Sequence, residues 1–265
     1  MPAWTHLIRF IAVEDCRTHI GQLVDTSRDV GLDSVNGTKI EAYLINGTIF
    51  DGEVTDQILT VKQILSPVSM EDCNYIRCLG LNYMDHAKVR PLKSWGRFGG
   101  SKLTSLQEAN MALPKAPILF TKPRTALTDP YPAAIPIPKC AQDGTSDYEA
   151  ELCVVIGKSG RNIPEEKALD YVLGYTASND VSARTLQMLT TQWSFSKGLD
   201  GSCPVGRSQI VPPSVFHMLT LYRARSRLAK NYHRPSDVVS QGDIQWPDGP
   251  GRQHQVSQTA CSNVR

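Results

Sequence analysis

Two acidic stretches of the sequence could carry out chemistry. The first is Asp147-Tyr-Glu149-Ala-Glu151. On a β-strand, Glu149 and Glu151 point to the same face, about 7 Å apart. Two carboxylates held in this way raise one another's pKa unless a cation lies between them. Hard cations such as Mg²⁺ and Mn²⁺ prefer oxygen ligands of this kind. The alternative is a solvated strand face beside Asp147, which needs no metal.

The second acidic stretch is Asn179-Asp180-Val-Ser-Ala-Arg184, between an expected strand and an expected helix. An acid at this place can cap the helix by accepting hydrogen bonds from its first N–H groups. Alternatively, Asp180 is a third carboxylate that completes a metal site with Glu149 and Glu151. Such a site leaves coordination positions open for water and a chelating keto-acid.

Two basic side chains could act beside this site. Lys197 follows the aromatic stretch that begins at Trp193 and precedes a glycine, a setting compatible with partial burial, although a lone lysine is usually a surface residue. His86 ends the stretch Asn82-Tyr-Met-Asp-His. It could equally be a hydrogen-bonded turn histidine, and its position alone does not assign it a role.

The elements that must position these residues are mainly strands. Apolar alternation or continuous apolar runs predict strands at 4–13, 76–81, 117–123, 148–157 and 174–177. We further expect a hairpin over 39–50 that turns at Asn46-Gly47, a short helix or turn over 60–67, a helix that starts at Pro164, and a helix over 181–191.

The composition is that of an ordinary globular protein, with 265 residues of which 41% are hydrophobic and 20% charged. No apolar run approaches the ~20 residues that cross a bilayer, and the first ten residues show no targeting pattern. We therefore expect a cytoplasmic protein without a membrane partner, with a mitochondrial location as the alternative. Seven cysteines without a CxxC pair do not predict a disulfide framework or a zinc site.

The net charge of +2 is unevenly distributed along the chain. Residues 89–107 carry four basic residues and no acidic one, and residues 217–265 carry seven basic and three acidic residues. Neither segment contains a nucleic-acid-binding motif, so no nucleic-acid partner is expected. A doubly wound nucleotide-binding fold is also excluded, because the chain has neither GxGxxG after a strand nor GxxxxGK[ST].

Five stretches, taken together and in order, resemble the signatures of the fumarylacetoacetate hydrolase family. They are Ile76-Arg-Cys-Leu-Gly-Leu-Asn-Tyr-Met-Asp-His86, Pro117-Ile-Leu-Phe-Thr-Lys122-Pro, Asp147-Tyr-Glu-Ala-Glu-Leu, Gly174-Tyr-Thr-Ala-Ser-Asn-Asp180-Val-Ser-Ala-Arg184 and Lys197-Gly-Leu-Asp-Gly-Ser-Cys-Pro-Val-Gly206. The likeness runs from about residue 70 to residue 210, apart from residues 89–107.

The resemblance implies an α+β fold of layered mixed β-sheet, assembled as a homodimer. We expect a small β-rich subdomain over residues 1–70, a catalytic domain over 71–216, and an unrelated, disordered tail over 217–265. Further strands and a Gly-Thr-Pro turn of the family are not found after Gly206, so the fold is expected to be C-terminally incomplete. A frame change or an alternative transcript would explain this, and a divergent tail is the alternative.

The resemblance also implies roles for individual residues. The ligands of Mg²⁺, or of Mn²⁺ or Ca²⁺, would be Glu149, Glu151 and Asp180. Lys197 would stabilise enolate or carboxylate charge, and Gln187 would help to hold the enol. His86 would be the water-activating base, oriented by the carboxylate of Glu108.

The motifs are compatible with three functions. The first is metal-dependent hydrolysis or decarboxylation of small keto-acids such as acylpyruvates or oxaloacetate, in which a C–C bond breaks. The second is isomerisation or tautomerisation of unsaturated keto-acids on the same metal site. The third is an inactive remnant that keeps only metal binding and the dimer surface.

Residues 89–107 separate His86 from Glu108, whereas compact family members have a His-x-x-Glu motif. Removing these residues would restore that motif, because Glu108 would then follow His86 by three positions. We hypothesise that the segment is a translated intron, since Val89-Arg90 can be encoded by GTACGT and Gln107 by CAG. The alternative is a genuine loop insertion over the site.

Sequencing of the transcript tests the intron hypothesis. We expect mRNA molecules that lack the codons for residues 89–107 and encode His86 and Glu108 three positions apart. A transcript population that uniformly contains these codons would instead identify the segment as a genuine insertion.

Overall fold

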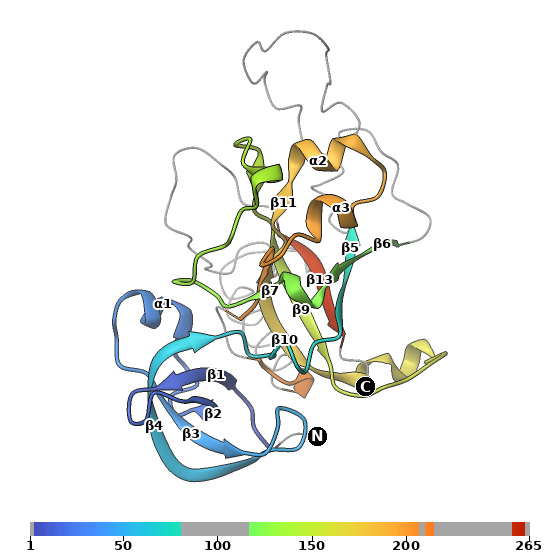
Figure 1. Cartoon of the computed structure of the whole chain (residues 1–265). Coiled ribbons are helices and arrows are strands. Elements are labelled where there is room, and N and C mark those ends of the chain that lie inside the picture. Colours follow the sequence, from blue (N-terminus) through green and yellow to red (C-terminus); the bar gives the residue numbers. More distant parts are fainter. Residues whose placement is uncertain (1–2, 81–116, 207–209, 215–255, 263–265) are drawn as a thin grey trace, which may run out of the picture.

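The computed structural model describes residues 3–80, 117–206 and 210–214 in full and residues 256–262 by their backbone. It contains a small closed barrel and a larger five-stranded sheet, with short elements over one end of the sheet (Figure 1). His86, Glu108 and the segment 89–107 lie outside the described residues.

The barrel is built from β1 (Leu7–Ala12), β2 (Thr18–Leu23), β3 (Glu41–Asn46) and β4 (Glu53–Leu65), all antiparallel. It closes because β4 pairs with both β3 and β1. Helix α1 (Val30–Val35) lies between β2 and β3 and is capped by the Asp29 side chain, which accepts a hydrogen bond from Leu32 N. The barrel lies within residues 1–70, where a β-rich subdomain is expected from the sequence.

The expected hairpin and the element after it differ from the sequence prediction. The strand β3 does end at Asn46-Gly47, where Gly47 has a φ of +110°. The following residues form a loop, because Thr48 N and Gly52 N hydrogen-bond within it, to Asp51 and Thr48. The predicted helix or turn over 60–67 is wrong. Residues 60–65 continue β4, because Thr60 pairs with β3 and residues 61–65 pair with β1, which satisfies their backbone groups.

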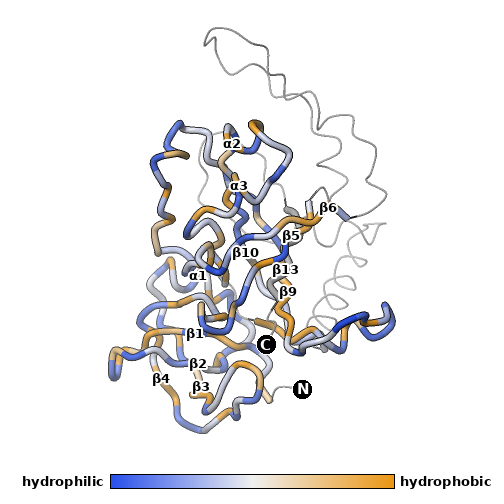
Figure 2. The backbone as a smooth tube through the Cα atoms, turned by 45° about the vertical axis from the view of Figure 1, so that its right-hand side comes forward, coloured by the Kyte–Doolittle hydropathy of each residue, from blue (hydrophilic) through white to orange (hydrophobic). Residues whose placement is uncertain are grey.

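The larger sheet has the strand order β10-β9-β13-β5-β6. These strands are β5 (Tyr75–Gly80), β6 (Ile118–Pro123), β9 (Ala150–Ile156), β10 (Val172–Asn179) and β13 (Val256–Ser262). The sheet is mixed, since β13 is parallel to β9 whereas the other pairs are antiparallel. Strand β9 is largely hydrophobic, as its colour in Figure 2 shows.

Strand β13 differs from the disordered tail expected over 217–265. Its seven residues lie between β9 and β5 in the middle of the sheet. The backbone groups of β9 and β5 that face this gap need hydrogen-bond partners, and β13 supplies them. The rest of the tail lies outside the described residues.

Short elements complete the described fold. They are the 3₁₀ helices η2 (Arg124–Ala126), η3 (Lys139–Ala141) and η4 (Glu165–Tyr171), the strand pairs β7 (Leu127–Thr128) with β12 (Cys203–Pro204) and β8 (Ser146–Asp147) with β11 (Ser182–Ala183), and the helices α2 (Arg184–Leu189) and α3 (Ser194–Lys197). The helix expected from Pro164 is thus a 3₁₀ helix, and the one expected over 181–191 is shorter. A mixed sheet with few helices confirms the α+β class. Among the described residues, no helix is long and apolar enough to cross a membrane.

The barrel is joined to the sheet through β1 and residues 210–211. Leu7 and Ile210 exchange two backbone hydrogen bonds of 3.0 and 2.9 Å, and Val211 does the same with Tyr175 of β10 at 2.9 and 3.0 Å. The Leu7 side chain is fully buried in the core beneath the sheet, whereas the next residue, Ile8, lies in the barrel core. Strand β1 therefore contributes to both cores.

Leu7→Ala is expected to lower the free energy of unfolding by about 2–5 kcal/mol, since it leaves a cavity where the two cores meet. Val13→Ala shortens a side chain that is 53% exposed. This variant should change the free energy of unfolding by no more than about 0.5 kcal/mol. Urea unfolding followed by circular dichroism measures both. Equal losses for the two variants would contradict this packing.

Candidate metal centre

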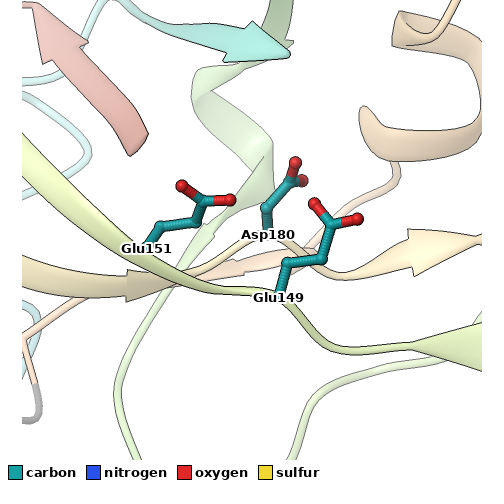
Figure 3. A group of neighbouring side chains, drawn as sticks. All are labelled: Glu149, Glu151 and Asp180. Atoms are coloured by element: carbon teal, nitrogen blue, oxygen red, sulfur yellow. The ribbon is translucent and has the colours of Figure 1, made fainter. Parts of the chain in front are cut away.

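Three carboxylates converge at one edge of the larger sheet. Glu149 immediately precedes β9, Glu151 lies within it, and Asp180 directly follows β10, its antiparallel neighbour. Because the start of one strand and the end of the other meet at the same edge, these side chains are brought together. One oxygen from each lies within 4.8 Å of the others. Figure 3 shows the three carboxylates on the same side of the chain.

The two alternatives that the sequence left open for these acids are wrong. All three side chains are buried, with exposures of 7%, 4% and 2%, so Glu149 and Glu151 are not on a solvated face. Asp180 does not cap a helix, because α2 has its N-cap at Ala183 and receives no side-chain capping bond.

Backbone hydrogen bonds hold the acids in place. Asp180 N donates to Glu149 O at 2.8 Å, and Glu149 N donates to the side-chain oxygen of Asn179 at 3.0 Å. Ser182 Oγ donates to Asp180 O at 3.0 Å. The turn after β10 is therefore bonded directly to the residue that precedes β9.

Lys197 lies at the centre of this group. Its ammonium donates to Glu149 Oε2 at 2.8 Å, to Asp180 Oδ2 at 2.8 Å and to Ser182 Oγ at 2.7 Å. The Phe120 ring covers it with a centroid distance of 5.3 Å. Helix α3 ends at Lys197 and so delivers the side chain from the layer above the sheet. The side chain is only 3% exposed, a deeper burial than the sequence indicates.

The ion pairs outweigh burial in setting the charge states. Burial by itself would raise the pKa of Glu149, but the Lys197 ammonium and then the Arg184 guanidinium lower this pKa from its usual 4.5 to about 2. Burial would lower the pKa of Lys197, but Asp180 and Glu149 hold that pKa above its usual value. Both groups are therefore charged at neutral pH.

Arg184 and Gln187 form an outer part of the site on α2. Arg184 Nη2 lies 2.7 Å from Glu149 Oε1 and 3.0 Å from Asp147 Oδ2. Arg184 Nη1 donates to Gln187 Oε1 at 3.0 Å. The contact described for Gln187 is thus with Arg184, which in turn holds Glu149.

Lys122 and Arg184 are residues of this group to which the sequence reasoning gave no role. Lys122 is fully buried, and its Nζ lies 2.7 Å from Asp180 Oδ1. The available signal was a lysine inside the apolar strand that Pro123 closes, where a charged side chain needs a partner. His86 and Glu108 lie outside the described residues, so their predicted roles stay predictions.

The residues present fit a divalent metal ion. The donors are all carboxylate oxygens, as hard cations prefer. Asp180 Oδ1 accepts no well-directed hydrogen bond in spite of the nearby Lys122, so it retains a lone pair. Among the described residues, the formal charges of the site are four negative ones, from Asp147, Glu149, Glu151 and Asp180, and three positive ones, from Lys122, Arg184 and Lys197. A divalent ion would turn this balance to one positive charge, which suits an anionic keto-acid.

The profile described as fumarylacetoacetate (FAA) hydrolase C-terminal matches residues 75–248. The chain therefore belongs to the fumarylacetoacetate hydrolase family, which confirms the resemblance found in the motifs. The match includes residues 217–248, so the expectation that the tail is unrelated to the family from residue 217 onwards is wrong for these residues.

Named relatives in this family are enzymes. The chain is 46% identical over 202 residues to caffeoylpyruvate hydrolase of Neonothopanus nambi, covering 74% of this chain and 63% of that protein. It is 39% identical over 145 residues to the mitochondrial oxaloacetate tautomerase fahd2 of Xenopus laevis, covering 54% of this chain and 38% of that protein.

A solved structure has the same fold. The 2-hydroxyhepta-2,4-diene-1,7-dioate isomerase from Mycobacterium marinum matches with a TM-score of 0.56 and 25% identity, over 79% of this chain and 66% of that one. The chain spans less than two thirds of the length of each of these three relatives.

The acid stability of the metal-free protein should depend on Glu149. Its folded pKa is depressed, so it contributes stability above its unfolded value of 4.5, and this contribution is lost as the pH falls towards about 2. In EDTA, the free energy of unfolding of Glu149→Gln should therefore fall less steeply between about pH 5 and 2 than that of the wild type. Urea unfolding at a series of pH values measures this slope. Identical slopes would contradict the ion pairs of Glu149.

Proposed function

We propose that this protein is a divalent-metal-dependent enzyme that hydrolyses a C–C bond in acylpyruvate-type keto-acids. The observation that carries the proposal is the convergence of three buried carboxylates within 4.8 Å beside the Lys197 ammonium. The relative named caffeoylpyruvate hydrolase supports the substrate class, because caffeoylpyruvate is an acylpyruvate.

Glu149, Glu151 and Asp180 would hold Mg²⁺, or alternatively Mn²⁺ or Ca²⁺, through their carboxylate oxygens. When bound, such an ion supplies Lewis-acid polarisation of the oxygens of the keto-acid. Arg184 keeps Glu149 ionised and fixed in orientation, so that it remains an anionic ligand.

The protein's own cation would bind the charge that develops in the reaction. When the C–C bond of an acylpyruvate breaks, its electron pair passes to the pyruvate part as an enolate. Lys197 is held in the site by Glu149, Asp180 and Ser182, so its positive charge already lies beside the carboxylates that would hold the metal. A direct hydrogen bond to the enolate would replace one of these three bonds. Gln187 Oε1 accepts a hydrogen bond from Arg184, so the amide N–H₂ group is the donor with which Gln187 would hold the enol.

His86, oriented by Glu108, is proposed as the base that takes a proton from water. The resulting hydroxide would add to the acyl carbonyl, and the C–C bond would then break with the pyruvate enolate as the leaving group. The acyl part becomes a carboxylic acid, and the enolate takes up the proton that His86 accepted, which gives pyruvate. Both residues lie outside the described part of the chain, so their assignment rests on the motif they share with the family.

The second candidate is isomerisation or tautomerisation of a keto-acid at the same site. The relatives named as an oxaloacetate tautomerase and a dienedioate isomerase favour it. This reaction also passes through an enolate, but only a proton moves and no C–C bond breaks. Oxaloacetate decarboxylation is a related outcome, in which CO₂ leaves. A remnant that binds metal without catalysis is the third candidate. We further propose that the protein is a homodimer and that it is located in the cytoplasm or, alternatively, in the mitochondrion.

Pyruvate release from an acylpyruvate in the presence of Mn²⁺ tests the proposed reaction. We expect turnover by the wild type and a loss of about 100–1000-fold in kcat for Lys197→Met, because the cation at the enolate is removed. Lys167→Met, on the exposed helix η4, is the matched control and should leave kcat unchanged.

The same samples separate the other candidates. Keto–enol conversion of oxaloacetate without pyruvate release would indicate a tautomerase. Release of CO₂ from oxaloacetate would indicate a decarboxylase. Mn²⁺ binding without any of these reactions would indicate the remnant. Turnover that persists in Lys197→Met, and also in the wild type treated with EDTA, would contradict the proposed site.

A further inference from the structure

Lys122 is a buried cation that the proposed reaction does not use. Its side chain is fully buried, and every partner of its ammonium is an oxygen of the protein. A lysine buried to this degree is costly unless its charge and its donors are satisfied. Its partners are Asp180 Oδ1 at 2.7 Å, Val181 O at 3.3 Å, Ser202 O at 2.9 Å, Ser202 Oγ at 3.1 Å and the carbonyl oxygen of Lys197.

These partners come from separate parts of the fold. Lys122 lies on β6, one edge strand of the five-stranded sheet, whereas Asp180 follows β10, the other edge strand. The carbonyl of Lys197 ends α3, and Ser202 lies just before β12. The Lys122 ammonium thus connects both edges of the sheet with the layer that carries Lys197.

Asp180 is held by one lysine on each carboxylate oxygen. Lys122 lies at Oδ1 and Lys197 at Oδ2, at 2.7 and 2.8 Å. Lys197 donates a hydrogen bond to Oδ2, and Lys122 attracts Oδ1 through its charge, so a cation at each oxygen restricts the rotation of the carboxylate. Ser202 Oγ reinforces the arrangement, because it donates to the Lys197 carbonyl at 2.8 Å and lies beside Lys122.

We infer that Lys122 is a positioning residue, which sets Asp180 and the end of α3 in the geometry that a divalent ion and the Lys197 ammonium require. The inference rests on the proposed metal site. Lys122 does not touch substrate, since its ammonium is enclosed by these protein oxygens and its side chain has no exposed surface.

A positioning role for Lys122 and simple electrostatics predict opposite effects on metal affinity when the Lys122 charge is removed. Lys122→Met keeps a chain of similar length but makes the site more negative by one charge, which alone would tighten the binding of a cation. If Lys122 positions Asp180, its loss frees that carboxylate, and metal affinity falls. Loss of a residue that orients a metal ligand typically weakens affinity about 10–100-fold.

The experiment is a titration of the full chain with Mn²⁺, in which free Mn²⁺ is measured by electron paramagnetic resonance. We expect Lys122→Met to raise the Kd by about 10–100-fold and Ser202→Ala to raise it by a few-fold. Circular dichroism at the same temperature establishes that each variant is folded. If Lys122→Met does not fold, Ser202→Ala decides the question.

Two controls separate positioning from a general loss of stability. Leu7→Ala destabilises the chain without removing any described contact of the carboxylates, Lys122 or Lys197, and should leave the Kd for Mn²⁺ unchanged. Lys158→Met removes an exposed lysine just beyond β9 and should also leave it unchanged. An unchanged or lower Kd in folded Lys122→Met, or an unchanged Kd in Ser202→Ala, overturns the inference. A wild-type chain that binds no Mn²⁺ overturns the metal site itself, and this inference with it.

Discussion

The burial of several carboxylates in one place is the constraint on which this structure depends. Taking Glu149, Glu151 and Asp180 out of water costs several kcal/mol each unless cations and hydrogen bonds replace the solvent. Lys122 and Lys197 supply ion pairs at Asp180, and Arg184 supplies one at Glu149. Glu149 and Asp180 each pair with two of these cations, so the loss of one cation leaves a buried carboxylate with a single counter-charge.

The topology makes this concentration of charge possible. Strands β9 and β10 are antiparallel neighbours, so the start of one and the end of the other lie at the same edge of the sheet. Strand β6 reaches the same place from the opposite edge and brings Lys122. The barrel contributes no charged group to the described contacts of the site. It contributes stability through β1, whose Leu7 packs in the core beneath the sheet.

The proposed site is suited to stabilising an enolate, which is common to several of the candidate reactions. Lys197 and the three carboxylates would serve hydrolysis, decarboxylation and tautomerisation alike, because each passes through an enolate. The reactions differ in whether water, CO₂ or only a proton moves. The relatives reflect this, since a hydrolase, a tautomerase and an isomerase share the family.

The sequence by itself determined the family and identified Glu149, Glu151 and Asp180 as candidate metal ligands, because both conclusions depend on local patterns. The stretches around Glu149 and Asp180 carry residue types and spacing that are rare in combination, and strands such as 76–81 and 148–157 follow from apolar periodicity. Only the tertiary structure decided that Asp180 pairs with lysines rather than caps α2, and that Lys122 lies beside it. It also decided that residues 60–65 extend β4 and that residues 256–262 lie within the sheet. In each of these cases the partner is distant in the chain. Hydrogen bonding and charge pairing between distant segments leave no periodic signal in the local sequence.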